Sequence, residues 1–198
     1  MTLLMSELST KDRIFNTATE LFKVKGYNEV TINDICEACE ITKSTFYYHL
    51  KSKQDIILHY YDHIISNLTP VLIQMLEITN PWEQTILLFD GLIQNIMDLG
   101  HDINSQLMIT NLQENRGIFD LRTDLADIAL RIIQKGQEAQ QIRNPSSPEQ
   151  LYEAAAYMFT GYEFMWCSLK GNFDWKGKFF AALENILNLE SSLRKYSN

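Results

Sequence analysis

The sequence predicts an all-α protein: a small N-terminal three-helix domain with a helix-turn-helix, followed by a larger helical body, with about nine helices in total. Along most of the chain, apolar residues recur every three or four positions, as on one face of a helix, and no stretch alternates as a strand does. Capping residues and helix-ending glycine or proline residues separate these segments. We expect residues 1–52 to form the N-terminal domain and residues 53–198 to form the body.

The composition is that of a globular protein. The chain has 198 residues, of which 45% are hydrophobic and 21% are charged, so it can bury a core. It contains no apolar run of about 18 residues, and a membrane-spanning helix is therefore not expected. The N-terminus lacks the basic start and the apolar stretch of a signal peptide, and three cysteines fit a reducing compartment. We expect a cytoplasmic protein with no membrane partner.

The helices of the N-terminal domain are predicted from their ends. The first helix ends at Gly26, because glycine favours the residue after a helix. Thr31 and Asp34, three residues apart, form a capping box that begins the second helix. The apolar pattern breaks after about nine residues, and Thr42 can cap a third, short helix. Two short helices joined by a tight turn are typical of a helix-turn-helix, in which the later helix lies in the DNA major groove.

The body divides into six helical segments. The first begins with a capping box at Ser52 and Asp55, and Pro70 is expected to end or kink it. Because this helix leaves the N-terminal domain and enters the body, it is the only evident mechanical link between them. The six segments cover residues 52–68, 81–99, 103–112, 121–139, 148–169 and 174–193.

The third helix has two chemically different faces. At about 100° per residue, Phe46 and Leu50 fall together and point inward. Ser44, Thr45 and Tyr48 then point the opposite way. Hydroxyl groups suit base edges at the centre of such a face, and the residues on its flanks suit phosphates. The flanking residues are Lys43, Tyr47 and His49.

The charge pattern supports a DNA-binding surface despite a formal net charge of −8. Residues 41–54 contain three lysines and no acidic residue, which is informative in an acidic chain. Residues 1–60 hold seven Lys or Arg and eight Asp or Glu, so most of the acidity belongs to the rest of the chain. A near-neutral N-terminal domain predicts few non-specific phosphate contacts and a modest dependence of binding on salt.

Residues 31–53 resemble the DNA-binding domain of the TetR/AcrR family of bacterial transcription regulators, and the resemblance covers roughly residues 10–60. Two residues depart from the family pattern. Glu40 stands where the family usually has a turn glycine, so the turn is expected to need an altered or strained backbone. Ser44 replaces a common glycine or proline. The resemblance is carried by Thr31, Asp34-Ile35-Cys36, Thr45-Phe46-Tyr47 and Lys51-Ser52-Lys53.

The resemblance implies a sequence-specific, DNA-binding transcription regulator: a repressor released from its operator by a small hydrophobic or aromatic effector. Family members dimerise through their two C-terminal helices, so a homodimer on a two-fold, double-stranded DNA operator is expected. The alternative is a DNA-binding protein whose body docks another protein and senses no small molecule.

Three sets of residues are predicted to carry these functions. The DNA-binding set is Thr31, Asn33, Thr42, Lys43, Ser44, Thr45, Tyr47, Tyr48, His49 and Lys53. The effector-binding set is Trp82, Phe89, Met97, Met108, Phe119, Tyr157, Phe164 and Trp166, although each of these side chains is also explained by core packing. The dimer-interface set is Met158, Tyr162, Met165, Phe180, Leu183 and Leu187, on two helices whose apolar residues occupy more than one face.

The sequence gives weaker support to redox chemistry, metal binding or a role for a charged residue in the body. Cys36 and Cys39 form a Cys-x-x-Cys, but it lies within a helix, where small packing residues occur in the family. His59 and His63 have the spacing of two metal ligands but no evident partners. Glu163 lies among aromatic residues and is expected to be exposed, with a cationic effector or a partner across the dimer interface as alternatives. We expect neither an enzyme nor a metal or cofactor.

Overall fold

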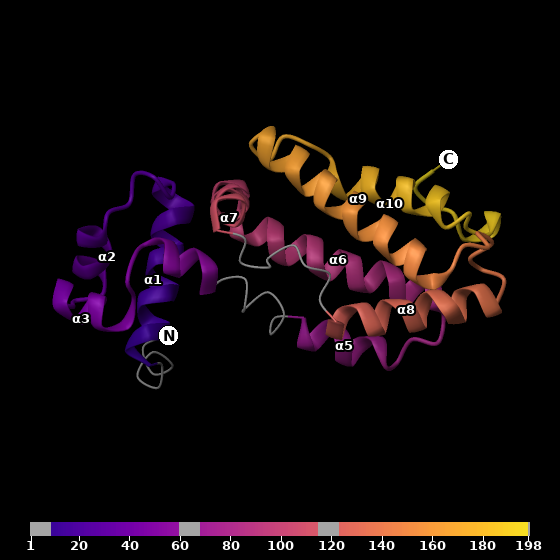
Figure 1. Ribbon diagram of the computed structural model, residues 1–198, viewed down its shortest axis with the longest axis horizontal. Helices are drawn as coiled ribbons and strands as arrows, with labels where there is room; N and C mark the ends of the chain where they lie inside the picture. Colours follow the sequence, from indigo (N-terminus) through magenta and orange to yellow (C-terminus); the bar gives the residue numbers. More distant parts are fainter. Residues whose placement is uncertain (1–8, 60–67, 115–122, 198) are drawn as a thin grey trace. The chain divides into compact units, whose positions relative to one another are not determined.

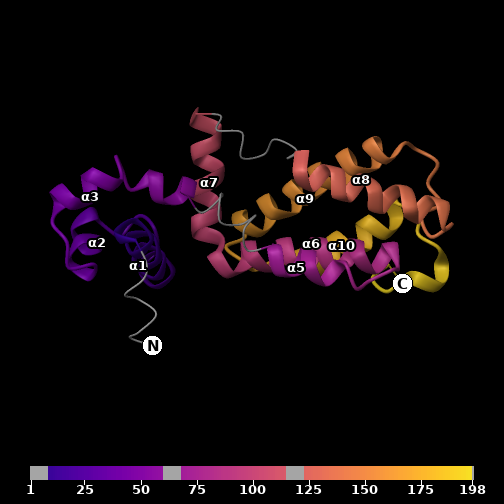
Figure 2. The same ribbon diagram turned by 90° about the horizontal axis from the view of Figure 1, so that it is seen from below.

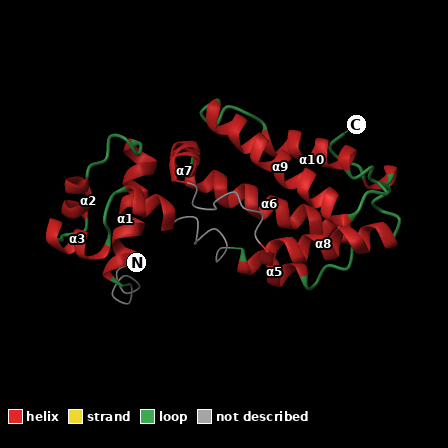
Figure 3. Ribbon diagram, viewed as in Figure 1, coloured by secondary structure: helices red, strands yellow, loops and turns green. Residues whose placement is uncertain are grey.

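The chain folds into helices joined by short turns, as the sequence predicted (Figure 1). The computed structural model describes residues 9–59, 68–114 and 123–197. Within these ranges every regular element is a helix, apart from one antiparallel bridge between Ile142 and Leu189 (Figure 3). None of the described helices is both long enough and apolar enough to cross a membrane. The predicted all-α class is therefore confirmed.

The N-terminal helices begin and end where local chemistry predicted. Helix α1 covers Thr10–Lys25 and is followed by Gly26, whose φ of 86° is in the region that favours glycine. Helix α2 covers Ile32–Ala38, and α3 covers Lys43–His49. The capping box predicted at the start of α2 is present, and a second one, formed by Ser9 and Asp12, begins α1.

The remaining helices follow the predicted segments with two differences. They are α5 (Thr69–Met75), α6 (Pro81–Leu99), α7 (His101–Glu114), α8 (Thr123–Glu138), α9 (Pro148–Ser168), α10 (Trp175–Ile186) and the 3-10 helix η1 (Ser191–Leu193). Pro70 lies in the first turn of α5, where a missing N–H costs nothing, so this proline begins a helix that was not predicted; the predicted end of the helix before it lies outside the described residues. The last helix ends at Ile186 instead of residue 193.

The early end of α10 has a tertiary cause. Asn188 adopts a φ of 47°, and the next residue, Leu189, is buried and forms a bridge with Ile142 in the connection between α8 and α9. The Glu184 carboxylate then accepts hydrogen bonds from the backbone N–H groups of Lys195, Tyr196 and Ser197. Burial by itself raises the pKa of Glu184, but these hydrogen bonds and one from the Ser197 hydroxyl outweigh it and hold the pKa below its usual value.

The structure separates into two units that differ from the predicted domains. One unit comprises Met1–Ser66 together with Met97–Ile118, and the other comprises Asn67–Ile96 together with Phe119–Asn198. The N-terminal unit therefore includes α7, a segment that lies more than forty residues beyond the predicted boundary at residue 52. The division follows tertiary contacts, whereas the predicted boundary followed the end of the helix-turn-helix.

The core of the second unit is built around α9. Helix α9 packs against both α8 and α10, as Figures 1 and 2 show from two directions. An aromatic cluster joins α6, α9 and α10: the Phe89 ring lies 5.8 Å from Phe159 and 4.8 Å from Phe179, and the Phe159 ring lies 5.1 Å from Trp175. Large aromatic side chains bury much apolar area, so this cluster is a main source of stability in the unit.

Candidate nucleic-acid interface and the helical body

Helix α3 presents one face to the core of the N-terminal unit and one face outward. Thr42 caps the helix by accepting a hydrogen bond from the Thr45 N–H at 3.1 Å. Phe46 and Leu50 are buried, which confirms the predicted inward face. The helix is thus fixed by its cap and by two apolar anchors, and its outer face is left for other contacts.

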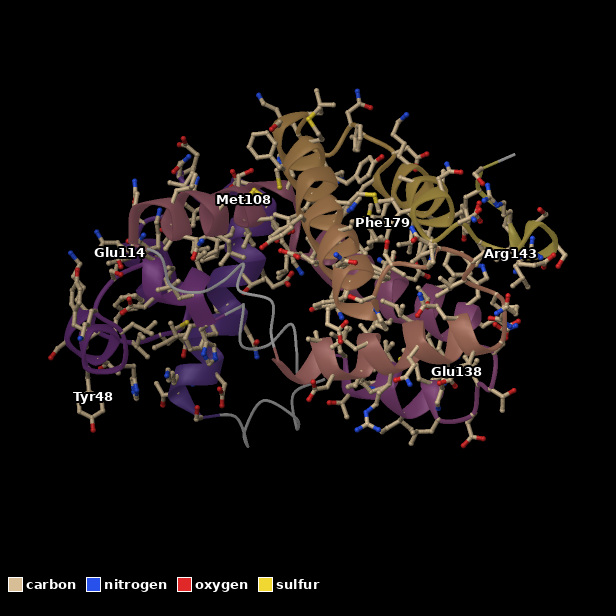
Figure 4. All side chains as sticks on the ribbon, turned by 45° about the vertical axis from the view of Figure 1, so that its right-hand side comes forward. Tyr48, Met108, Glu114, Glu138, Arg143 and Phe179 are labelled. Atoms are coloured by element: carbon tan, nitrogen blue, oxygen red, sulfur yellow. The ribbon has the colours of Figure 1, made fainter. Side chains whose placement is uncertain are left out.

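The outward face of α3 carries the residues predicted to read DNA. Tyr48 is 85% exposed, and Figure 4 shows its side chain projecting away from the ribbon. Ser44, Lys43 and Tyr47 are exposed as well, and His49 is half-buried against the Tyr48 ring at 5.0 Å. No acidic residue lies on α3. The face is therefore open to bases and phosphates, and the individual DNA contacts stay predictions.

The threonines of this region have structural partners. Thr31 and Asp34 form a capping box at the start of α2, in which the Thr31 hydroxyl and the Asp34 carboxylate are hydrogen-bonded. The hydroxyls of Thr42 and Thr45 lie 2.9 Å apart and share a hydrogen bond. These side chains hold the two helix N-termini in place, so any contact they make with DNA is additional to a capping role.

The turn between α2 and α3 contains the altered backbone that the sequence predicted. Glu40 has a φ of 53°, in the left-handed region that is strained for residues with a side-chain carbon. Its N–H donates to the Glu37 carbonyl, and the Ile41 N–H donates to the Cys36 carbonyl at 2.9 Å. These hydrogen bonds close α2 and hold Glu40 in the strained conformation.

Replacing this residue by glycine should stabilise the protein. Glu40→Gly removes the left-handed strain, so we expect the free energy of unfolding to rise by up to about 1 kcal/mol. Glu37→Gly, at an exposed helical position three residues earlier, should instead lower it by up to about 1 kcal/mol. Urea unfolding of both variants measures the two effects, and a destabilised Glu40→Gly would contradict the strain.

Lys53 has more partners inside the protein than the sequence suggested. Its Nζ donates to the Tyr27 carbonyl at 2.6 Å and to the Val30 carbonyl at 2.8 Å, and it lies 4.0 Å from the centre of the Tyr27 ring. Burial lowers the pKa of Lys53, while nearby Asp102 and Glu29 act in the opposite direction. Lys53 therefore connects the segment after α3 to the α1–α2 connection by hydrogen bonds. The sequence did not predict this structural role. Its predicted phosphate contact is untested.

Helix α7 is joined to the helix-turn-helix part of the N-terminal unit by polar contacts. The Asp102 carboxylate accepts a hydrogen bond from the Tyr27 N–H at 2.5 Å, and the Gln54 amide donates to the Thr110 hydroxyl at 3.0 Å. Thr110 is itself buried. Helix α7 follows α6 directly in the chain, so the α6–α7 connection is a second link between the N-terminal unit and the rest of the chain. The prediction that the helix after Lys53 is the only mechanical link is therefore corrected.

The cysteine and histidine pairs have packing roles where the structure describes them. Cys36 and Cys39 are both buried and both are free thiols, and burial raises the pKa of Cys36, which disfavours the reactive thiolate. The His59 ring stacks on the Phe15 ring at 3.6 Å. His63 lies outside the described residues. Among the described residues, no group of three or more His, Cys, Asp or Glu side chains could hold a metal ion.

The predicted effector-binding residues are scattered. Tyr157 and Phe164 are exposed on α9, and neither lines the apolar cavity of the second unit. Met97 and Met108 belong to the N-terminal unit, the latter in α7 (Figure 4). Phe119 lies outside the described residues. Periodicity alone could not separate these positions, because both core and surface residues recur at helical spacing.

The second unit contains a small apolar cavity between α6, α8, α9 and α10. Phe89 lines it, whereas Trp82 and Trp166 are buried elsewhere in the core. The other lining residues were not singled out from the sequence, because most are aliphatic and resemble ordinary core positions. The complete lining is Thr85, Leu88, Phe89, Ala129, Ile132, Ile133, Tyr152, Ala155, Leu183 and Leu187.

Three of the predicted dimer-interface residues are core residues. Phe180, Leu183 and Leu187 are at most 2% exposed, so they are not available to a second chain, and the prediction is corrected for them. They point inward because α10 uses its apolar face against α9 and the C-terminal residues, as the stacking of Tyr196 on Phe180 at 5.0 Å illustrates. Met158 and Tyr162 are partly buried, and Met165 is exposed.

Helix α9 carries an exposed stripe that the sequence did not distinguish from its core face. At about 100° per residue, its members fall within one face of the helix. Gly161 lies at the middle, and a side-chain carbon added there would meet no described atom within 4 Å. Phe164 is 57% exposed on the same face. The α9 stripe consists of Ala154, Tyr157, Met158, Gly161, Phe164, Met165 and Ser168.

These features define an all-α helix-turn-helix protein with a helical body. The N-terminal part matches the family described as "Bacterial regulatory proteins, tetR family" over residues 14–60. The transposon Tn10 TetC protein of Escherichia coli is 29% identical over 90 residues, which is 46% of each chain. The biofilm operon icaADBC HTH-type negative transcriptional regulator IcaR of Staphylococcus aureus (strain Newman) is 44% identical over 46 residues, 23% of this chain and 25% of IcaR. The matches thus span less than half the length of these curated relatives.

Solved structures share the fold along most of the chain. Thermus thermophilus FadR, a TetR family transcriptional repressor in complex with lauroyl-CoA, has a TM-score of 0.67 at 21% identity, covering 93% of this chain and 96% of that chain. AibR in complex with isovaleryl coenzyme A and operator DNA has a TM-score of 0.56 at 18% identity, covering 92% and 100%. At these identities the likeness shows the fold alone. Residues 14–60 thus match the tetR family of bacterial regulatory proteins, and most of the chain shares the fold of solved structures of that family.

Proposed function

We propose that this protein is a transcriptional repressor that binds a two-fold DNA operator as a homodimer and is released by a small-molecule effector. The observation that carries the proposal is the outward face of α3, which is free of acidic residues and presents Tyr48 and Ser44 to solvent. A surface helix without a partner would more commonly carry mixed Glu and Lys residues. The match of residues 14–60 to the tetR family supports the same function.

The residues of α3 divide by their expected roles. Ser44 and Tyr48 lie on the outward face and carry hydroxyl groups that can hydrogen-bond base edges, so they are proposed to set sequence preference. Lys43, Tyr47 and His49 lie on its flanks, where phosphates run along both sides of the major groove. In this arrangement the bases are read by neutral donors and acceptors, and the modest positive charge limits non-specific binding.

The α9 stripe is proposed as the dimer interface. A single short reading helix contacts too few base pairs for useful specificity, whereas two copies related by a two-fold axis double the site. Gly161 costs about 1 kcal/mol in a helix interior relative to alanine, and that cost is offset if its bare backbone lets a second α9 approach closely. If wild-type protein proves monomeric, this stripe instead supports the alternative in which the body docks another protein.

Effector binding is proposed to release the protein from its operator through two connections between the reading helices and the body. One is the helix that follows Lys53, and the other is the direct connection from α6 to α7. FadR was solved in complex with lauroyl-CoA and AibR with isovaleryl coenzyme A, so an acyl-CoA is one effector class to test on this chain. A ligand that favours one arrangement of α6 would move α7, and with it the contacts of Asp102 and Thr110. Effector and operator would then bind antagonistically, each weakening the other by the same factor.

The proposal is tested by measuring operator binding of one tyrosine variant. Footprinting on the DNA that flanks the protein's own gene identifies the operator, and fluorescence anisotropy then gives the affinity. Tyr48→Ala should lower operator affinity by about tenfold, corresponding to the loss of one good base contact, and leave binding to unrelated DNA nearly unchanged. Leu112→Ala, which also removes an exposed side chain from the N-terminal unit, is the control and should have no effect. Equal losses on operator and unrelated DNA would contradict the reading role.

A further inference from the structure

Glu163 is a buried acid in the middle of α9. The residue is only 9% exposed, although glutamate is among the residues least often buried without a partner. Its carboxyl group has no hydrogen bond or ion pair with any described residue. Burying an unpaired carboxyl group opposes folding, so a site that retains it is a candidate for function.

The Glu163 side chain lies on the face of α9 that packs against the core. The expectation that this residue is exposed is therefore corrected. At about 100° per residue, position 163 is roughly opposite to Gly161, the centre of the α9 stripe. It falls instead with Phe159 and Trp166, which lie one turn before and one turn after it. The side chain therefore lies on the core-facing side of α9 and not in the proposed dimer interface.

Aromatic rings lie along the core-facing side of this part of α9. The Trp175 ring lies 5.1 Å from the Phe159 ring and 5.7 Å from the Trp166 ring, so it bridges the turn that carries Glu163. Trp175 is almost fully buried, and its Nε1–H has no hydrogen-bond partner in the described structure. The faces of tryptophan and phenylalanine rings attract cations, most strongly where water is excluded. Glu163 lies one helical turn from the residues that carry two of these rings, so its carboxylate can add a second attraction for the same positive charge.

The charged residues described on neighbouring helices do not neutralise Glu163. Lys176 of α10 is paired with Asp90 of α6 at 2.6 Å. Lys178 lies 6.0 Å above the Phe173 ring and is exposed. Burial, which disfavours the charged form, raises the pKa of Glu163 from 4.5 to about 7. Near neutral pH the group can therefore exist both as an acid and as a carboxylate.

We propose that Glu163 determines effector specificity and that the effector carries a positively charged nitrogen, which is bound between the Glu163 carboxylate and the rings of Phe159, Trp166 and Trp175. The inference rests on the proposed effector-binding function and adds the chemical class of the ligand. A buried carboxylate gains most from a ligand that brings its own counter-charge, because the ion pair then replaces an uncompensated charge. A neutral ligand of the same shape gains only the apolar contacts.

The experiment compares two probes that differ by one charge. Benzyltrimethylammonium is the cation, and neopentylbenzene, in which carbon replaces the nitrogen, is its neutral counterpart. Tryptophan fluorescence measures binding, since Trp166 and Trp175 lie at the site. Wild-type protein should bind the cation at least tenfold more tightly than the neutral probe. Glu163→Gln should lose at least tenfold in cation affinity, about 1.4 kcal/mol, while its affinity for the neutral probe stays within about twofold.

A control variant and a pH series separate this effect from general changes in the protein. Glu153→Gln removes an acid from an exposed position of the same helix and should leave cation binding unchanged. Cation affinity of the wild-type protein should fall as the pH is lowered from about 8 to about 6, because protonation removes the attracting charge, and Glu163→Gln should lack this dependence. Equal cation affinity in wild type and Glu163→Gln would overturn the inference, as would equal affinity of wild type for both probes.

Operator binding distinguishes failure of this inference from failure of the proposed function. If wild-type protein binds its operator but does not discriminate between the probes, the cationic class is wrong, and effectors without a positive charge, such as an acyl-CoA, are the next to test. If it binds no operator, the regulator function itself fails, whatever the probes do. A lower operator affinity in the presence of the cation, lost in Glu163→Gln, would support both.

Discussion

Phe164→Glu should convert the protein from a dimer to a monomer and lower its operator affinity by at least about 100-fold. The residue lies on the α9 stripe and is 57% exposed within one chain, so the substitution leaves the monomer core intact. In a two-fold dimer formed by this stripe, each change occurs twice, so apolar contact is lost and like charges are brought together. A monomer presents one reading helix instead of two, and the second half-site no longer contributes to affinity.

Sedimentation velocity measures the oligomeric state, and fluorescence anisotropy measures operator affinity in the same samples. Leu76→Glu is the matched control, because Leu76 is an exposed leucine that lies off the stripe, at the end of α5. Far-ultraviolet circular dichroism checks that both variants remain folded. A dimeric Phe164→Glu would show that another surface forms the interface. By contrast, Phe180→Glu should unfold the body, since Phe180 is fully buried.

Glu163→Gln should stabilise the protein at alkaline pH and remove part of its pH dependence. The pKa of Glu163 is raised by burial to about 7, from 4.5 for an unburied glutamate. Between these values the folded state binds more protons than the unfolded state, so stability falls as the pH rises from about 4.5 to about 7 and then levels off. The shift corresponds to about 3 kcal/mol at pH above 7. A neutral glutamine of the same shape avoids this cost.

Urea unfolding at a series of pH values tests this expectation. The free energy of unfolding of Glu163→Gln minus that of wild type should grow by about 3 kcal/mol between about pH 4.5 and pH 8. Taking this difference removes the contributions of groups common to both proteins, including Glu184, whose lowered pKa acts in the opposite direction below about pH 4.5. A difference that does not change with pH would show that Glu163 titrates normally in the folded protein.

The sequence by itself determined the helix ends and the reading face. The capping box at Thr31 and Asp34, the cap at Thr42 and the helix-ending Gly26 all occur where the sequence predicted them. Each depends on residues within about four positions of one another, so neighbouring side chains and backbone groups suffice to specify it. The outward position of Tyr48 follows equally from the period of one helix. The left-handed turn at Glu40 was also expected from the residues around it.

Tertiary structure decided which apolar face of each C-terminal helix is buried. Helices α9 and α10 carry apolar residues on more than one face, so periodicity could not tell that Leu187 packs inside while Phe164 faces solvent. The same limit applies to charges: Glu163 and Lys53 are polar residues whose burial depends on segments distant in the sequence. The contact of Asp102 with Tyr27 joins residues 75 positions apart. Such pairings come from the packing of whole helices, which local patterns do not encode.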